Sequence, residues 1–211
     1  VGKYAYGEKN DTAYCHMFAA GKVDFSNGIS LECRTDYPYG MSVKYNVTGS
    51  GILAVRIPKW SRNYTLTVDA TEVTAAPENG YVYVAVNGYT QVELLLDGTP
   101  RFVRASSRVP RLTGMAALMR GPLVYCFEGA DNGSVRELRI DRSVIPAVEE
   151  FDPDFLGGTT RLTAKAYRAA DCDDLYSSKP EELTPCEATA IPYYAWGNRG
   201  ENEMRVWLNV K

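Results

Sequence analysis

The feature that most limits the possible folds is the spacing of turn residues. Glycine, proline, asparagine and aspartate interrupt the chain roughly every 8 to 14 positions, and the segments between them are short. No segment of the first hundred residues sustains the apolar spacing of an amphipathic helix, whereas residues 52–57, 65–69 and 81–86 alternate in the way that strands do. The pattern predicts an all-β protein made of antiparallel β-sandwiches.

A break in the pattern divides the chain near its middle. Strand-like segments continue to residue 96, the turn Asp97-Gly98-Thr99-Pro100 follows, and a new series begins at Arg101. The 211 residues therefore predict two β-sandwich domains in tandem, at 1–100 and 101–211. The final segment, 204–210, belongs either to the second domain or returns to the first, and the sequence leaves this choice open.

Charge and composition exclude several classes of function. Lys plus Arg number 23 and Asp plus Glu number 26, which gives a net charge of −3 without the basic excess of a nucleic-acid-binding protein. No apolar run approaches the length of a membrane span. The single histidine, His16, leaves little material for general-base or multi-histidine metal chemistry, and we expect it to be packed or to lie on a rim.

The five cysteines are widely spaced and do not form a disulfide scaffold. Cys15, Cys33 and Cys126 lie in apolar segments, so they are predicted to be buried. Cys172 and Cys186 lie in polar sequence, and a disulfide between them stays possible. We predict no metal site. The alternating Asp171, Asp173 and Asp174 resemble a calcium loop but lack its spacing of glycine and glutamate.

The first residues give weak information about location. Residues 1–6, VGKYAY, lack the basic start and apolar core of a signal peptide, which favours the cytoplasm. Secretion remains open, because a processed protein or a piece of a longer chain could also begin in this way.

The densest group of aromatic and polar residues lies at 191–200, IPYYAWGNRG. Aromatic faces beside amide and guanidinium donors are the groups that bind sugar rings. The candidate contact residues are Tyr193, Tyr194, Trp196, Asn198 and Arg199. Their partner would be a carbohydrate or a neighbouring catalytic domain, and the alternative is a structural loop whose aromatic rings pack between the two sandwiches.

The same segment carries a family resemblance. IPYYAWGNRG, followed by EMRVW, resembles the C-terminal signature of glycoside hydrolase family 127, the β-L-arabinofuranosidase-like family. TDYPYG at 35–40, AVRIPKWS at 54–61 and MRGPLVYCFEGADN at 119–132 also resemble it, in the same order. The opening VGKYAY, which leads into AYCHMF, is similar to the stretch that follows the catalytic domain of that family.

The resemblance implies that the catalytic part lies elsewhere. In this family an (α/α)6-barrel carries a zinc-bound cysteine nucleophile, and none of Cys15, Cys33 and Cys126 matches that motif. We therefore assign no catalytic residue and no cofactor to this chain, and we expect zinc in the absent catalytic domain.

The function that follows is an accessory one. The chain is expected to be the C-terminal β-sandwich region of a hydrolase acting on β-L-arabinofuranosides, packed on its own barrel. The alternative is an autonomous carbohydrate-binding module that uses Tyr193, Tyr194 and Trp196 to contact arabinose-containing glycans. Apolar surface uncovered by the absence of the barrel would promote self-association.

Overall fold

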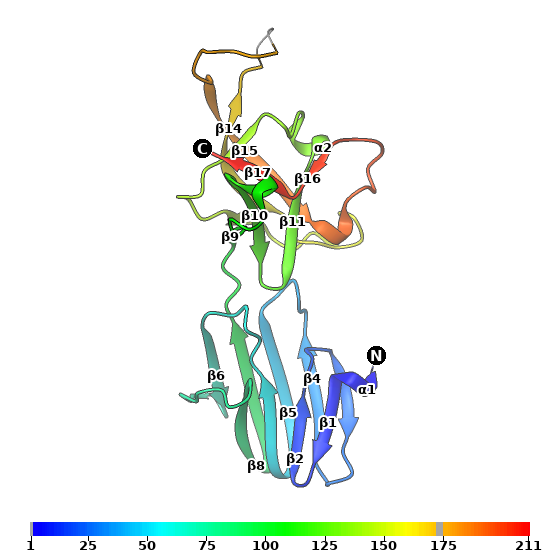
Figure 1. Cartoon of the computed structure of the whole chain (residues 1–211). Helices are drawn as coiled ribbons and strands as arrows, with labels where there is room; N and C mark the ends of the chain where they lie inside the picture. Colours follow the sequence, from blue (N-terminus) through cyan, green and yellow to red (C-terminus); the bar gives the residue numbers. More distant parts are fainter. Residues whose placement is uncertain (1, 172–174) are drawn as a thin grey trace. The chain divides into compact units, whose positions relative to one another are not determined.

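The computed structural model describes residues 2–171 and 175–211 (Figure 1). Strands make up most of the regular structure, which confirms the all-β prediction. Contacts between residues divide the chain into two compact units, Val1–Gly98 and Thr99–Lys211. In the described residues, no helix has the length and apolar character needed to cross a membrane.

The first unit is one mixed sheet in the order β1-β2-β5-β8-β6-β7, and the β3–β4 hairpin joins it at β5. Every pairing is antiparallel except β2 with β5, a parallel pair that the sequence analysis did not predict. The elements are α1 (Gly2–Ala5), β1 (Tyr6–Lys9), β2 (Thr12–Cys15), β3 (Gly21–Asp24), β4 (Ser30–Thr35), β5 (Ser42–Arg56), β6 (Tyr64–Val68), β7 (Thr71–Glu72) and β8 (Tyr81–Leu96).

Two long strands turn this sheet into a sandwich. The sequence predicted a strand at 52–57, but β5 begins ten residues earlier and pairs with β8 without interruption, from Ser42↔Leu95 to Arg56↔Tyr81. Gly49 and Gly51 have positive φ angles of 135° and 150°, so they bend β5 without ending it. The first half of β5 pairs with β4 and the second half with β2.

Alternate residues of both halves of β5 point into the same core. Val43, Tyr45 and Val47 come from the first half and Leu53 and Val55 from the second, and all five are fully buried in one cluster. The sheet is therefore folded over itself, and its two layers share a single apolar interior.

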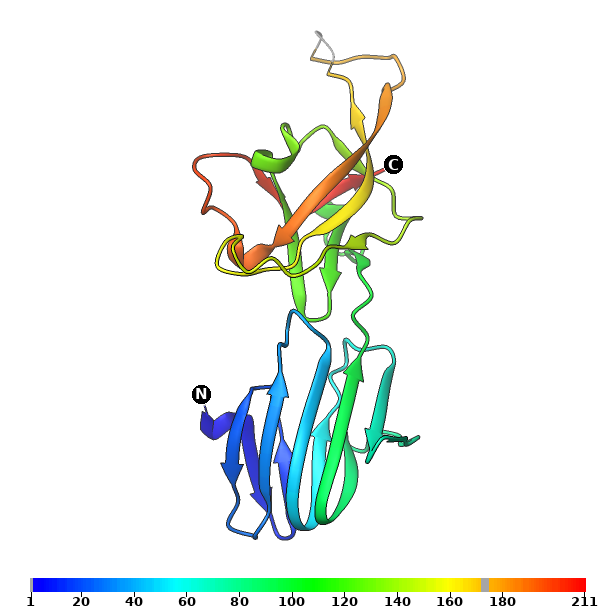
Figure 2. The same ribbon diagram turned by 180° about the vertical axis from the view of Figure 1, so that it is seen from behind.

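The second unit contains one sheet whose pairings return to their starting point. Strands β10, β11, β15, β14, β12 and β17 pair in that order, and β17 pairs again with β10. Strand β9 pairs with one edge of β10, and the opposite edge of β10 pairs with β17 over residues 115–117 and with β11 over residues 118–120. The sheet is therefore folded over on itself around one apolar core, and β16 is an edge strand on β11 (Figures 1 and 2). The strands are β9 (Arg101–Arg104), β10 (Met115–Arg120), β11 (Leu123–Glu128), β12 (Leu138–Ile140), β13 (Ala147–Val148), β14 (Leu162–Ala169), β15 (Leu183–Pro192), β16 (Met204–Arg205) and β17 (Trp207–Val210), with short helical turns η1 (Pro110–Leu112), α2 (Gly129–Asn132) and η2 (Tyr193–Ala195).

Small residues on two paired strands make room for large side chains elsewhere in the core of the second unit. Ala164 of β14 lies directly opposite Ala188 of β15, and both are fully buried. They share the core with Tyr125 and Phe127 of β11, whose side chains fill the interior. The last strand, β17, pairs with β10 and, in parallel, with β12, so it is part of the second unit.

Candidate functional site

The loop that joins β15 to β16 contains all five residues predicted to contact a ligand or a neighbouring domain. It begins with η2 and runs from orange to red in Figure 1. The five side chains have different surroundings. Asn198 and Arg199 make bonds within the protein, whereas Tyr193, Tyr194 and Trp196 are exposed.

Arg199 holds the loop to β11 and α2 through two carboxylates. Its Nε lies 3.0 Å from Oε2 of Glu128, a side chain that is only 1% exposed, and its Nη1 lies 2.7 Å from Oδ1 of Asp131. Hydrogen bonding to Asp131 and to Glu128 raises the pKa of the Arg199 guanidinium above its already high usual value. The backbone N–H of Gly197 donates to the other oxygen of Glu128 at 2.8 Å. The buried carboxylate is thus paired and hydrogen-bonded, as burial of a charge requires.

Asn198 is also used inside the loop. Its amide Nδ2 donates to the carbonyl oxygen of Ala195 at 3.0 Å. A side chain that closes its own turn in this way is oriented by the loop. The polar residues of this segment therefore set the loop conformation, a role that the sequence analysis did not assign to them.

The three aromatic residues remain accessible. Tyr193 and Trp196 are each 44% exposed, and their rings stack with centroids 6.3 Å apart and planes 24° from parallel. Tyr194 is 52% exposed, and its hydroxyl lies 3.3 Å from the hydroxyl of Thr159. The result is an aromatic surface carried on a loop that an ion pair keeps in place. Whether it binds a sugar stays a prediction.

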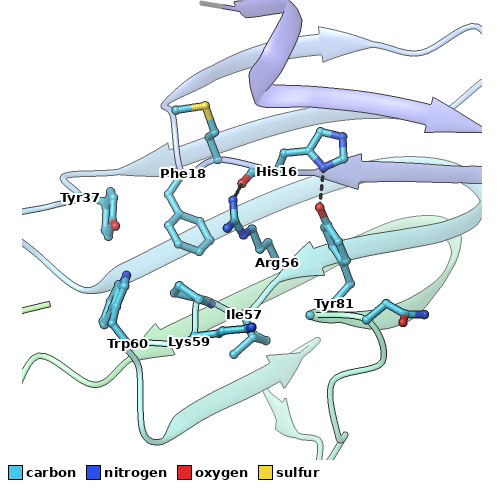
Figure 3. A pocket seen from close by; sticks show the side chains of 12 residues that line it. His16, Phe18, Tyr37, Arg56, Ile57, Lys59, Trp60 and Tyr81 are labelled. Atoms are coloured by element: carbon cyan, nitrogen blue, oxygen red, sulfur yellow. Dashed lines mark hydrogen bonds between the residues drawn. The ribbon is translucent and has the colours of Figure 1, made fainter. Parts of the chain in front are cut away.

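A second site, which the sequence analysis did not identify, lies in the first unit. It is a pocket of about 790 Å³ (Figure 3). Its lining comes from the segment after β2, the turn before β5, the end of β5 with the residues that follow it, and the start of β8. The lining residues are His16, Met17, Phe18, Tyr37, Arg56, Ile57, Pro58, Lys59, Trp60, Asn79, Gly80 and Tyr81.

His16 is fixed at one end of this pocket. Its Nδ1 lies 2.7 Å from the Tyr81 hydroxyl, and its ring stacks on Tyr14 with a centroid distance of 5.8 Å. A Cβ atom built on Gly7 would lie 2.8 Å from Nε2 of His16, so the ring packs against the backbone of β1. The prediction of a packed or rim histidine is confirmed.

Aromatic rings form the other end of the pocket. Phe18 meets Tyr37 edge to face at a centroid distance of 5.0 Å, and Tyr37 stacks on Trp60 at 6.4 Å. Burial raises the pKa of the Tyr37 phenol, which is therefore neutral at physiological pH. All three rings are partly buried against the core of the first unit.

The charges in the pocket are positive. Arg56 and Lys59 are both exposed in it, and no aspartate or glutamate belongs to the lining. Among the described residues neither cation forms an ion pair, and Arg56 makes one long hydrogen bond, 3.4 Å from its Nη1 to the carbonyl oxygen of His16. The pocket therefore combines an apolar aromatic wall with two cations.

A sequence signal for both sites existed in the segments that resemble one family. AYCHMF, TDYPYG and AVRIPKWS supply His16, Tyr37 and Arg56 to the pocket. MRGPLVYCFEGADN and IPYYAWGNRG supply Glu128 and Arg199 to the ion pair. The sequence of each segment alone does not show that their side chains meet in the folded protein.

The segments that form the two sites fall within regions that match the profiles of known protein domains. Residues 12–97 match the profile of the "Beta-L-arabinofuranosidase, GH127 middle domain", and residues 100–209 match that of the "Glycoside hydrolase family 127 C-terminal domain".

The chain belongs to glycoside hydrolase family 127.

Individual family members agree in sequence and in structure. A non-reducing end beta-L-arabinofuranosidase from Bifidobacterium longum subsp. longum is 38% identical over 98% of this chain. A GH127 beta-L-arabinofuranosidase from Geobacillus stearothermophilus T6 superposes over the whole chain with a TM-score of 0.92 at 31% identity. A second GH127 beta-arabinofuranosidase structure gives a TM-score of 0.85 at 27% identity over 99% of the chain. The chain spans only 34 to 36% of the length of these three proteins.

Three cysteines of this GH127 chain do not resemble reactive thiols. Cys15, Cys33 and Cys126 are buried, as predicted. Burial raises the pKa of all three, that of Cys126 to about 12. Cys186 is partly exposed, and Cys172 lies outside the described residues, so a disulfide between these two, which the sequence left open, is not tested.

The described residues also do not fit the zinc site expected of the family. Within 2–171 and 175–211, no group of three His, Cys, Asp or Glu residues is arranged to hold a metal ion. Two of the three aspartates that resemble a calcium loop, Asp173 and Asp174, lie outside these ranges.

Proposed function

We propose that this chain is the non-catalytic accessory region of a GH127 hydrolase that acts on β-L-arabinofuranosides, and that it packs on and supports an (α/α)6-barrel catalytic domain. The observation that carries the proposal is the alignment. The chain matches domains described as middle and C-terminal, and it spans about a third of relatives that are named as beta-L-arabinofuranosidases.

The chemistry of the chain supports this division of labour. A cysteine nucleophile acts as the thiolate, and a reactive cysteine therefore has a lowered pKa and an accessible position. Cys15 and Cys126 have the opposite properties, because both are fully buried and their pKa values are raised. The zinc and the nucleophile would be supplied by the catalytic domain.

The proposal is tested by separating the two parts. The 211-residue chain should not hydrolyse an aryl β-L-arabinofuranoside above the uncatalysed rate, under conditions in which the complete B. longum relative is active. Deleting the aligned region from that relative should lower the unfolding temperature and the soluble yield of its catalytic domain. Hydrolysis by the chain at a comparable rate, or a catalytic domain unaffected by the deletion, would contradict the proposal.

One observation favours a second function, that of a carbohydrate-binding module. Tyr193 and Trp196 form a stacked, half-exposed aromatic surface, and such faces stack on sugar rings. Because Asn198 and Arg199 are occupied by internal bonds, few polar groups remain to orient a ligand, and we expect weak binding. Calorimetric titration with arabino-oligosaccharides tests this function. Heat that disappears in Trp196→Ala supports it, and no heat at millimolar ligand excludes it.

A further inference from the structure

We infer that the aromatic pocket of the first unit, lined by His16, Phe18, Tyr37, Arg56, Lys59 and Trp60, is the docking site for a carboxylate-bearing apolar segment of the catalytic domain. The inference rests on the proposed function and adds to it the place and the chemistry of the contact. The volume of this pocket, about 790 Å³, is more than twice that of each of three cavities in the second unit, which measure about 330 to 360 Å³.

The first observation is where the chain enters the unit. The backbone N–H groups of His16 and Met17 donate to the carbonyl oxygen of Ala5 at 2.8 and 3.2 Å, so α1 is fastened to the rim of the pocket. Figure 3 shows this helix above His16. A domain that precedes the middle domain would join the chain at α1. Its nearest segments would therefore lie within reach of the pocket.

The second observation is the apolar wall. Phe18 contacts Tyr37, and Tyr37 contacts Trp60. Ile57 and Pro58 of the same lining are buried. Partly exposed aromatic rings beside a cavity leave apolar area in contact with water, and covering that area is favourable. An inserted Leu, Phe or Met side chain of the partner segment would remove it from water.

The third observation is charge. Arg56 and Lys59 lie beside the aromatic wall, and neither has an acidic partner among residues 2–171 and 175–211, although the chain as a whole carries a net charge of −3. Bringing a neutral or basic surface against them would desolvate two cations without compensation. A segment that carries an aspartate or glutamate satisfies them, and a bidentate contact with Arg56 would fix its orientation.

A free sugar fits these groups less well. Sugar hydroxyls both donate and accept hydrogen bonds, whereas Arg56 and Lys59 only donate, and the acceptors of this lining are limited to neutral groups such as the Asn79 amide and the tyrosine hydroxyls. Carbohydrate binding in the pocket is therefore an outcome that the experiment must detect and that would overturn the inference.

The experiment uses the complete protein, the catalytic domain joined to residues 1–211. The test variants are the double charge reversal Arg56→Glu/Lys59→Glu and the single variant Trp60→Ala. The matched controls are Lys9→Glu, an exposed lysine at the end of β1, and Tyr89→Ala, a 59% exposed tyrosine of β8, both outside the pocket. Each substitution is also made in the isolated 211-residue chain.

Two measurements identify docking. Cleavage between the domains by a small amount of protease tracks the population of the undocked form, and it should rise about tenfold or more in the test variants but not in the controls. Calorimetry of the complete protein should show its transition splitting into two, while the charge-reversed isolated chain unfolds at the wild-type temperature.

Several outcomes overturn the inference. The first is that both test variants are cleaved and unfold as the wild-type protein does. The second is that the charge reversal destabilises the isolated chain as much as the complete protein. The third is that the isolated chain binds arabino-oligosaccharides and that Trp60→Ala abolishes this binding. If deletion of the whole region destabilises the catalytic domain but the pocket variants do not, the inference fails and the proposed function stands. If the deletion also has no effect, both fail.

Discussion

At the scale of single residues, the ion pair between Arg199 and Glu128 is the strongest constraint on the exposed aromatic loop. Removing one partner of a buried pair leaves a charge without compensation, which costs about 3 to 5 kcal/mol. We expect Arg199→Ala to lower the free energy of unfolding of the second unit by that amount, because the Glu128 side chain is 1% exposed. Urea unfolding followed by fluorescence measures it.

The control is an arginine in a surface pair. Arg136 lies 2.9 Å from Glu203, with side chains 71% and 38% exposed, and such pairs contribute at most about 1 kcal/mol. Arg136→Ala should therefore have a small effect. Equal losses for the two variants would show that the loop does not depend on Arg199.

Tyr125 makes stability depend on pH in the alkaline range. Its hydroxyl donates to the carbonyl oxygen of Thr160 at 3.1 Å, and burial raises its pKa to about 12. Since the unfolded chain releases this proton near pH 10, the unfolded state binds fewer protons than the folded state above that pH, and stability falls as pH rises. Wild-type protein should lose roughly 1 kcal/mol more than Tyr125→Phe between pH 9 and 11. Parallel urea curves of both proteins at each pH test this, and identical slopes with pH would contradict it.

At the scale of elements, the bend in β5 depends on a close approach of two backbones. A Cβ atom on Gly51 would lie 2.4 Å from the carbonyl oxygen of Asp11, which accepts the N–H of Ile52 at 3.0 Å. Gly51→Ala adds this clash to the strain of a positive φ angle and should cost about 2 to 4 kcal/mol.

Gly88 in the paired strand β8 separates the effect of the backbone clash from the effect of the positive φ angle. It has a φ angle of 76°, but a Cβ atom there would meet nothing within 4 Å. Gly88→Ala should therefore lower the free energy of unfolding by only about 1 kcal/mol, because the positive φ angle is its only unfavourable effect. Thermal unfolding of both variants tests the difference, and a Gly51→Ala variant as stable as Gly88→Ala would show that the bend adapts.

The elements also show how far sequence patterns reach. The segment 65–69 was predicted as a strand and β6 runs from Tyr64–Val68, because alternation reports burial on one face. The continuity of β5 through Gly49 and Gly51 could not be predicted, since a glycine that bends a continuous strand and one that ends it leave the same local signal. The fold of the second sheet depends on the pairing of β10 with β17, which lies at the other end of the unit. A local sequence pattern cannot predict a pairing between segments so far apart.

The two sites differ in the same way. The aromatic loop was readable because its residues are neighbours in sequence. The ion pair that holds it joins residues 71 positions apart, and the pocket joins His16 to Tyr81 across 65. Contacts at such separations depend on the folded topology, and single-residue patterns carry no information about them.

At the scale of the whole molecule, both units contain buried cysteine thiols. One alkylation experiment can therefore test whether any of them is a reactive nucleophile. Cys15 and Cys33 lie in the core of the first unit, and Cys126 is buried in the second. A pKa of about 12 at Cys126 lowers its thiolate fraction at pH 8 roughly a thousandfold relative to an unfolded thiol.

We expect iodoacetamide at pH 8 to leave these three cysteines unmodified in the native chain and to modify all three in urea. Mass mapping of each peptide reads this out, with the partly exposed Cys186 as the internal control that reacts first. Rapid modification of any of the three in the native state would show an accessible thiolate, and the assignment of all nucleophilic chemistry to another domain would then have to be withdrawn.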